Sequence, residues 1–209
     1  MLHNLIDWLL HLDTHLAALA SGHGVLVYGV LFAVIFIETG VVVMPFLPGD
    51  SLLFVTGALS AQGVLAWPVA APVLVVAAIA GDALNFALGG IMRRKAIEAR
   101  RIPFIKAAHI ARTQAFFDRH GKKTIILARF VPVVRTLAPF VAALGSMPYP
   151  TFFSYNVIGA LAWVAGLLGA GYALGNVAWV GAHLTAVLLG LIVLSLLPGM
   201  VGWARARKA

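Results

Sequence analysis

Long hydrophobic blocks dominate this chain, and polar or helix-breaking residues separate them. An apolar run of about 20 residues is long enough to cross a bilayer as a helix. Residues 68–92, 150–176 and 179–201 meet that length, so we expect about three full transmembrane helices there. The pattern predicts an all-α polytopic membrane protein.

A further apolar block, residues 25–63, is broken in its middle. Pro45, Pro48 and Gly49 cannot continue a regular helix. The segment after them, 51–61, makes only about three helical turns, which is too short to span a membrane. Broken backbone at membrane depth is tolerated where it is buried in protein or lines water. We therefore predict a re-entrant hairpin.

A second broken block covers residues 124–147 and contains Pro132 and Pro139. Its pattern F-x-P-x-x-R-x-L at 130–137 matches F-x-P-x-x-S-x-L at 46–53, and each is followed by one long span. Because one span separates the two hairpins, we expect them to enter the membrane from opposite sides. Inverted repeats with broken helices are a recurring transporter plan.

The positive charges are concentrated in one loop. Of the fifteen Lys and Arg residues, ten lie in residues 93–123 and three in the tail of the segment 177–209, and residues 1–92 contain none. Cytoplasmic loops carry an excess of Lys and Arg, so loop 93–123 and the C-terminus are predicted to be cytoplasmic. Residues 1–24 have the apolar and polar faces of an interfacial amphipathic helix.

Composition agrees with the hydrophobic blocks. Hydrophobic residues make up 62% of the chain and charged residues 11%, which excludes an ordinary soluble domain. The pI near 10.5 reflects the basic loop, and we expect no nucleic-acid partner. A polar stripe of His3, Asp7, His11 and His15 cannot close a tetrahedral metal shell from one helix. We expect no metal site and no cofactor.

Four charged residues lie inside the broken blocks: Glu38 and Asp50 in the first, Arg129 and Arg135 in the second. Ionisable groups at membrane depth are expensive and usually functional. We predict that the four meet in the bilayer, with the acids as proton-coupling candidates. The arginines are candidates for a lipid phosphate, because guanidinium offers planar, forked donors. The alternative is a set of structural ion pairs, although buried pairs are poor stabilisers.

Three neutral or acidic residues are secondary polar candidates. Asp82 and Asn85 lie one helical turn apart in the span 68–92, and Asn156 lies in the span 150–176. Asp82 either belongs to the site or makes only a polar contact between helices.

Five motifs occur in order between residues 25 and 176. They are E-T-G-V-V-V-M-P-F-L-P-G-D at 38–50, G-D at 81–82, F-x-x-x-G at 117–121, R-F-x-P-x-x-R at 129–135 and N-x-x-G-x-x-x-W at 156–163. In these motifs the chain resembles the DedA family, the bacterial members of the SNARE-associated (VTT-domain) membrane proteins. The family often has an aromatic-Gly pair shortly after Gly-Asp, and this chain has Ala83-Leu84-Asn85-Phe86 instead.

The resemblance implies two facing re-entrant hairpins in the bacterial inner (plasma) membrane. It also implies roles in envelope maintenance and proton-motive-force homeostasis, with some members recycling undecaprenyl phosphate. Eukaryotic relatives resemble phospholipid scramblases. The family's functional acids map onto Glu38 and Asp50, and its functional arginines map onto Arg129 and Arg135.

Together these observations predict an inner-membrane lipid-carrier transporter, a flippase for undecaprenyl phosphate or a related anionic lipid, coupled to protons. Its partners are membrane lipids and protons, and the sequence leaves oligomerisation open. We expect no enzyme, because no Ser-His-Asp or metal-ligand set lies near the hairpins. Two alternatives are a proton-coupled exchanger of small cations or drugs, in which the acids bind the cargo, and a passive phospholipid scramblase.

Overall fold

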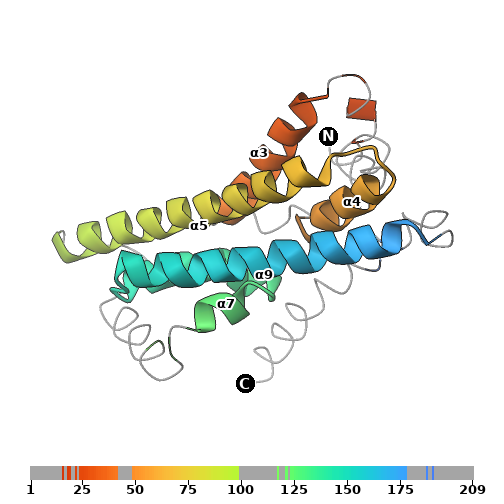
Figure 1. Cartoon of the computed structure of the whole chain (residues 1–209). Coiled ribbons are helices and arrows are strands. Elements are labelled where there is room, and N and C mark those ends of the chain that lie inside the picture. The colour runs from red at the N-terminus through yellow and green to blue at the C-terminus, as the bar shows by residue number, and fades with distance from the viewer. Residues whose placement is uncertain are drawn as a thin grey trace. The chain divides into compact units, whose positions relative to one another are not determined.

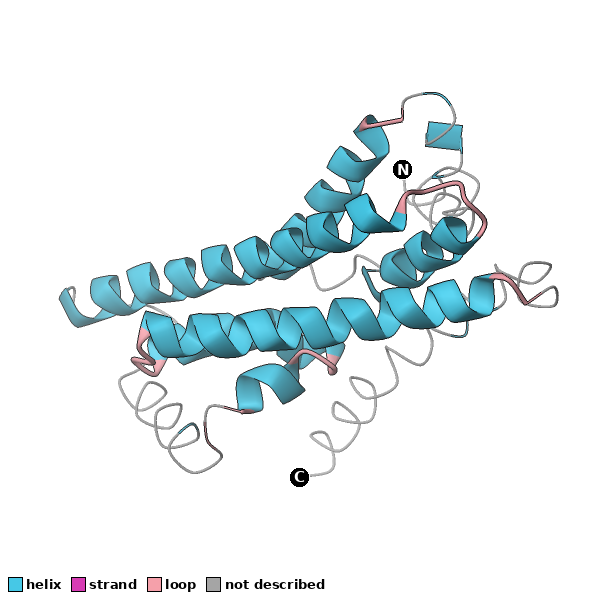
Figure 2. Cartoon of the chain, in the orientation of Figure 1, coloured by secondary structure: helices cyan, strands magenta, loops and turns pink. Residues whose placement is uncertain are grey.

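The computed structural model describes residues 24–41, 49–98, 121 and 123–177, together with Leu16, Ala18, Leu19, Gly22, Phe117, Val187 and Gly190. Within these residues every regular element is an α-helix, and the loops that the structure describes are short (Figure 2). The helices are α3 (Leu26–Gly40), α4 (Gly49–Ala61), α5 (Trp67–Glu98), α7 (Thr124–Ala128), α8 (Pro132–Leu144) and α9 (Tyr149–Gly175). All of them except α8 are labelled in Figure 1. The all-α prediction is confirmed for this part of the chain.

Several predicted features lie outside the described residues. They are the N-terminal amphipathic helix, the breakers Pro45 and Pro48, most of the basic loop 93–123, and the last span at 179–201 with its tail.

Among the described residues, two helices are long and apolar enough to cross a membrane, and they match the spans predicted at 68–92 and 150–176. The segment Trp67–Lys95 of α5 has 29 residues and a mean hydropathy of 1.9, and α9 has 27 residues and a mean hydropathy of 1.8. At 1.5 Å per residue each is about 40 Å long, more than the roughly 30 Å of a hydrocarbon core. Only 39% and 33% of their most apolar stretches are buried in the protein, which leaves wide apolar faces for lipid.

The chain divides into two compact units, and α5 and α9 each contribute to both. The first unit comprises residues 1–35, 46–77 and 162–209. Gly49 begins α4, a helix of 13 residues that is buried along nearly its whole length. Its backbone lies against α9, because a Cβ added at Gly171 would collide with the carbonyl oxygen of Phe54. Small residues permit such close helix packing in membranes.

The second unit comprises residues 36–45 and 78–161. Its apolar core is small and is built from α7, α8 and α9 around Ile125, Ala128, Ala138, Ala142 and Phe152. From α5, Phe86 stacks on Phe152 with ring centroids 4.3 Å apart. This core supports α7 and α8 beside the long helices.

The block predicted to break within 124–147 does so at residues 129–131. Val131 has an extended backbone (φ −117°, ψ 106°) and Pro132 opens α8, where its missing N–H has no helical partner to lose. Pro139 lies inside α8. With 5 and 13 residues, neither α7 nor α8 is long enough to span a bilayer.

Helices α3 and α5 come into backbone contact in the second unit. A Cβ added at Gly81 would lie 2.8 Å from the carbonyl oxygen of Phe36 and 3.1 Å from the amide nitrogen of Gly40, and it would also collide with Thr39 Oγ1. Only glycine fits at position 81. This crossing brings together the polar residues next to it on the two helices.

We therefore expect Gly81→Ala to destabilise the protein by about 1–3 kcal/mol, because the new methyl group overpacks the crossing. Thermal unfolding of the purified protein in detergent measures the change. The matched control is Gly90→Ala on the same helix, where nothing lies within 4 Å of an added Cβ. Equal unfolding temperatures for the two variants would contradict the close contact.

Candidate functional site

One ion pair joins α8 to α3. Arg135 Nη2 donates a hydrogen bond to Glu38 Oε1 over 2.5 Å, although the two residues are 97 positions apart in sequence. Their side chains are only 4% and 1% exposed. Because a buried charge is strongly destabilising without a partner, each of these residues depends on the other. Glu38 is thus in direct contact with Arg135, one of the two arginines that the sequence predicts near it.

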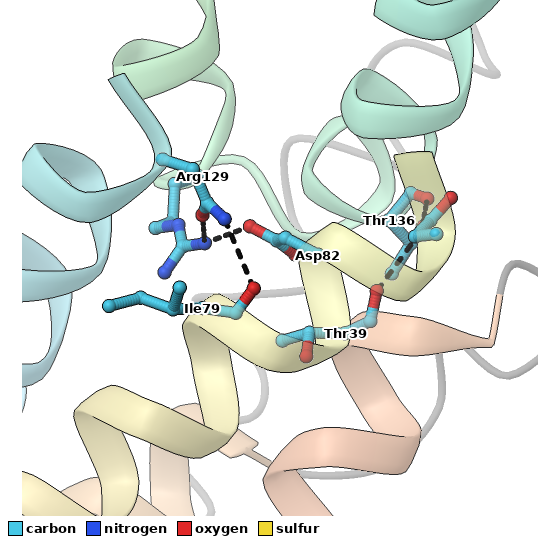
Figure 3. Close-up of polar contacts among 7 residues, drawn as sticks. Thr39, Ile79, Asp82, Arg129 and Thr136 are labelled. Carbon is cyan, nitrogen blue, oxygen red and sulfur yellow. Dashed lines mark hydrogen bonds and ion pairs between the residues drawn. The ribbon is translucent and has the colours of Figure 1, made fainter. Parts of the chain in front are cut away.

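A second ion pair joins the residue after α7 to the middle of α5. Arg129 Nη2 donates to Asp82 Oδ2 and, over 2.7 Å, to Asn156 Oδ1 from α9 (Figure 3). Asn156 Nδ2 in turn donates to the carbonyl oxygen of Ile79 over 3.1 Å. One turn after Asn156, a Cβ at Gly159 would lie 3.6 Å from Arg129 Cδ, so this part of α9 packs directly against the arginine side chain. Helices α5 and α9 thus hold the guanidinium between them.

Asn85 links the two chain segments that carry the first ion pair. Its Nδ2 group donates to the carbonyl oxygen of Thr39 over 3.0 Å and to that of Thr136 over 2.8 Å (Figure 3). Thr39 directly follows Glu38, and Thr136 directly follows Arg135. The amide therefore fixes the distance between the backbones from which Glu38 and Arg135 reach each other.

The two arginines and Asp82 line a common cleft. Its other lining residues are Ile125, Ala138 and Pro139, and it holds about 180 Å³ of space between atoms, part of it open to the surface. That space is narrow and has no room for a water-sized sphere. A larger group reaches the guanidinium groups only when the ion pairs separate.

Asp50 lies in the first unit, on α4. Its Oδ1 accepts a hydrogen bond from Trp163 Nε1 over 2.9 Å. The sequence places Glu38 and Asp50 opposite the two arginines, whereas the structure gives Arg129 a different carboxylate, that of Asp82. The second unit brings together the other candidates of the sequence analysis: Glu38, Asp82, Asn85, Arg129, Arg135 and Asn156.

Sequence reasoning does not single out four hydrogen-bond partners of the candidate residues: Trp163, Thr39, Thr136 and Ile79. Trp163 closes the motif N-x-x-G-x-x-x-W and lies two helical turns after Asn156, so the motif held a signal for it. Thr39 and Thr136 accept through their backbone carbonyls, which every residue type has. No sequence pattern could have revealed that contact.

The site is built from charged and carboxamide side chains. It offers two guanidinium groups, two carboxylates and two carboxamides, all nearly inaccessible to solvent. Among the described residues, no group of three His, Cys, Asp or Glu side chains could hold a metal ion. An anion that approaches the cleft competes with Glu38 and Asp82 for the arginines.

Comparisons with known proteins identify the family. The model of the VTT domain matches residues 47–173. The chain is 46% identical over 211 residues to protein DedA of Escherichia coli (strain K12), an alignment that covers 100% of this chain and 96% of that protein. The chain belongs to the DedA family. The resemblance stated from the motifs is confirmed.

More distant members of the DedA family align with most of the chain. An uncharacterized membrane protein of Mycobacterium leprae is 38% identical over 168 residues, covering 80% of this chain and 75% of its own length. Inner membrane protein YghB of Escherichia coli (strain K12) is 36% identical over 179 residues, covering 85% and 82%. No solved structure matches the chain. Together with the two apolar helices, the family identifies this chain as a membrane protein.

Because Asn85 donates to carbonyls on both sides of the first ion pair, we expect Asn85→Leu to lower stability by about 1–3 kcal/mol through the loss of two buried hydrogen bonds. Thermal unfolding in detergent measures the loss. Asn176→Leu, at an exposed position just after α9, is the control for the same chemical change. If Asn85→Leu unfolds at the wild-type temperature, Asn85 does not hold the ion pair in position.

Proposed function

We propose that this protein is an inner-membrane transporter that moves undecaprenyl phosphate, or a related anionic lipid, between the leaflets of the bilayer and couples that movement to protons. The observation that carries the proposal is the pair of buried arginines on one cleft, each in an ion pair with a buried carboxylate. The groups present bind an anion and exchange charge, so we propose transport without chemical change to the lipid. This role would support the envelope and the proton motive force.

Arginine suits a lipid phosphate for physical reasons. Its guanidinium keeps its charge at any relevant pH and forms short, charge-assisted hydrogen bonds with phosphate oxygens. Arg129 and Arg135 both face the cleft, so one headgroup can contact both when their acids release them. The lipid tail remains in the hydrocarbon core of the bilayer, so no free energy is needed to move it out.

The ion pairs explain how binding and proton movement are linked. A buried carboxylate is stable as an anion only beside a cation or strong donors. When a phosphate takes Arg135, Glu38 loses its cation and binds a proton instead. When the phosphate leaves, the proton leaves and the ion pair forms again. We assign Glu38 this role on its direct contact with Arg135.

We further propose that the broken segments form two re-entrant hairpins of opposite orientation. One comprises α3 and α4, and the other comprises α7 and α8. Helix α4 covers about 20 Å and is buried nearly throughout, as a short helix at membrane depth must be. The charge distribution supports a cytoplasmic loop at 93–123 and a cytoplasmic C-terminus.

Single cysteines introduced into the cysteine-free chain test this topology. Cysteines at Arg101 and Lys208 should react with a membrane-impermeant maleimide only from the cytoplasmic side, because those regions carry the excess of positive charge. A cysteine at Gly63, in the turn after α4, should react only from the periplasmic side. Periplasmic labelling at position 101 would overturn the inverted arrangement of the hairpins.

The decisive experiment follows headgroup translocation in proteoliposomes, with undecaprenyl phosphate compared with phospholipids, with and without a pH gradient. A coupled lipid transporter moves the lipid phosphate and responds to the gradient. Gradient-independent movement of phospholipids would support a passive scramblase. Failure to move any lipid, together with proton flux driven by small cations or drugs, would support the exchanger.

If the arginines bind phosphate, Arg129→Lys and Arg135→Lys should each lower undecaprenyl phosphate transport by about tenfold or more, because Lys keeps the charge but loses the planar fork. The proteoliposome assay measures the rate, and membrane insertion should be unchanged. Arg94→Lys, near the end of α5, is the control. Wild-type transport in both site variants would indicate that the arginines serve only as counter-ions and would favour the cation exchanger.

A further inference from the structure

Asp82 is a buried acid paired with an arginine, as Glu38 is. Its side chain is buried at 4% exposure, and Oδ2 is bound to Arg129. The other carboxylate oxygen, Oδ1, is buried and accepts no hydrogen bond from any residue that the structure describes. A carboxylate held from one side only depends on that single cation for its charge.

The charges around Asp82 balance in pairs. Arg129 and Arg135 line the same cleft as Asp82, and Glu38 on α3 neutralises Arg135. Helix α9 contributes Asn156, which has no charge. Within this group two cations face two anions, so an arriving anion leaves one excess negative charge unless an acid takes up a proton.

We propose that Asp82 is a proton-carrying residue of the transport cycle, linked to Arg129 as Glu38 is linked to Arg135; this inference rests on the proposed function. When a phosphate oxygen takes Arg129, the Asp82 carboxylate binds one proton from the aqueous phase. When the lipid leaves, Asp82 releases that proton and pairs with Arg129 again. No covalent bond of the lipid changes, and each anionic charge that enters is matched by one proton.

The position of Asp82 favours this role over that of a fixed structural contact. A buried ion pair adds little stability, since desolvation offsets most of its attraction. Asp82 also faces the cleft that a headgroup must enter, next to both guanidinium groups. Asp50, in contrast, accepts a hydrogen bond from the neutral indole of Trp163.

The test separates lipid exchange from net transport, with undecaprenyl phosphate in proteoliposomes of the full chain. In exchange, one anion replaces another on Arg129 and the empty site never forms, so no proton is required. Net transport must pass through the empty site, where Asp82→Asn leaves the buried charge of Arg129 without its carboxylate. We expect Asp82→Asn to lose at least about tenfold more of its pH-driven net transport than of its lipid exchange. Asp82→Glu should recover net transport.

Two results would overturn the role of Asp82. One is wild-type net transport, with wild-type pH dependence, in Asp82→Asn. The other is a parallel loss of exchange and net transport together with a lower unfolding temperature that Asp82→Asn/Arg129→Gln restores, which identifies a structural pair. A wild-type protein that moves undecaprenyl phosphate in neither assay would overturn the proposed function itself.

A measurement on the wild-type protein avoids any folding defect of a variant. Dicyclohexylcarbodiimide enters membranes and reacts with protonated carboxyl groups, and mass spectrometry locates the modified residue. We expect undecaprenyl phosphate to raise the modification of Asp82 several-fold, and undecaprenol, which lacks the phosphate, to leave it unchanged. Equal modification with both lipids would show that the headgroup does not protonate Asp82.

Discussion

The pairing of each buried arginine with a carboxylate from a distant helix is the interaction on which the second unit depends. The effective penalty for burying an ion is several kcal/mol, and Asp82 and Glu38 offset a large part of that cost for Arg129 and Arg135. The helices that supply the acids, α5 and α3, must therefore lie beside the broken segment that supplies the arginines. Charge neutralisation determines which helices are neighbours, and the small apolar core fills the space around them.

Two further features hold the helices in the positions from which the paired side chains reach each other. Close backbone contact at Gly81 places α3 and α5 at a short distance from each other, and Asn85, one turn after Asp82, spans from α3 to α8. Asn156 performs the corresponding task for Arg129 from α9. Carboxamides suit these positions, because they donate and accept hydrogen bonds without adding a charge that would need its own partner.

The same pairs explain why a member of the DedA family could move an anionic lipid. A buried ion pair is weakly stabilising as a whole but strongly unfavourable when one partner is removed. An incoming phosphate can therefore replace a carboxylate at modest net cost, provided that the released acid is neutralised. Under the proposed function, the narrow cleft beside Arg129 and Arg135 would be the closed form of such a site, with the acids in the place that the anion would take.

Sequence alone determined the local properties of this protein. Hydropathy and length predict the helices α5 and α9 closely, and proline placement predicts the break before Pro132, because both depend only on neighbouring residues. The sequence also identified Glu38 and both arginines as buried charges. It did not determine which acid meets Arg129, since that depends on how helices cross, and the tertiary structure selects Asp82. The hydrogen bonds from Asn85 to two backbone carbonyls likewise follow only from the tertiary structure, because every residue has a backbone carbonyl and the sequence does not show which ones accept.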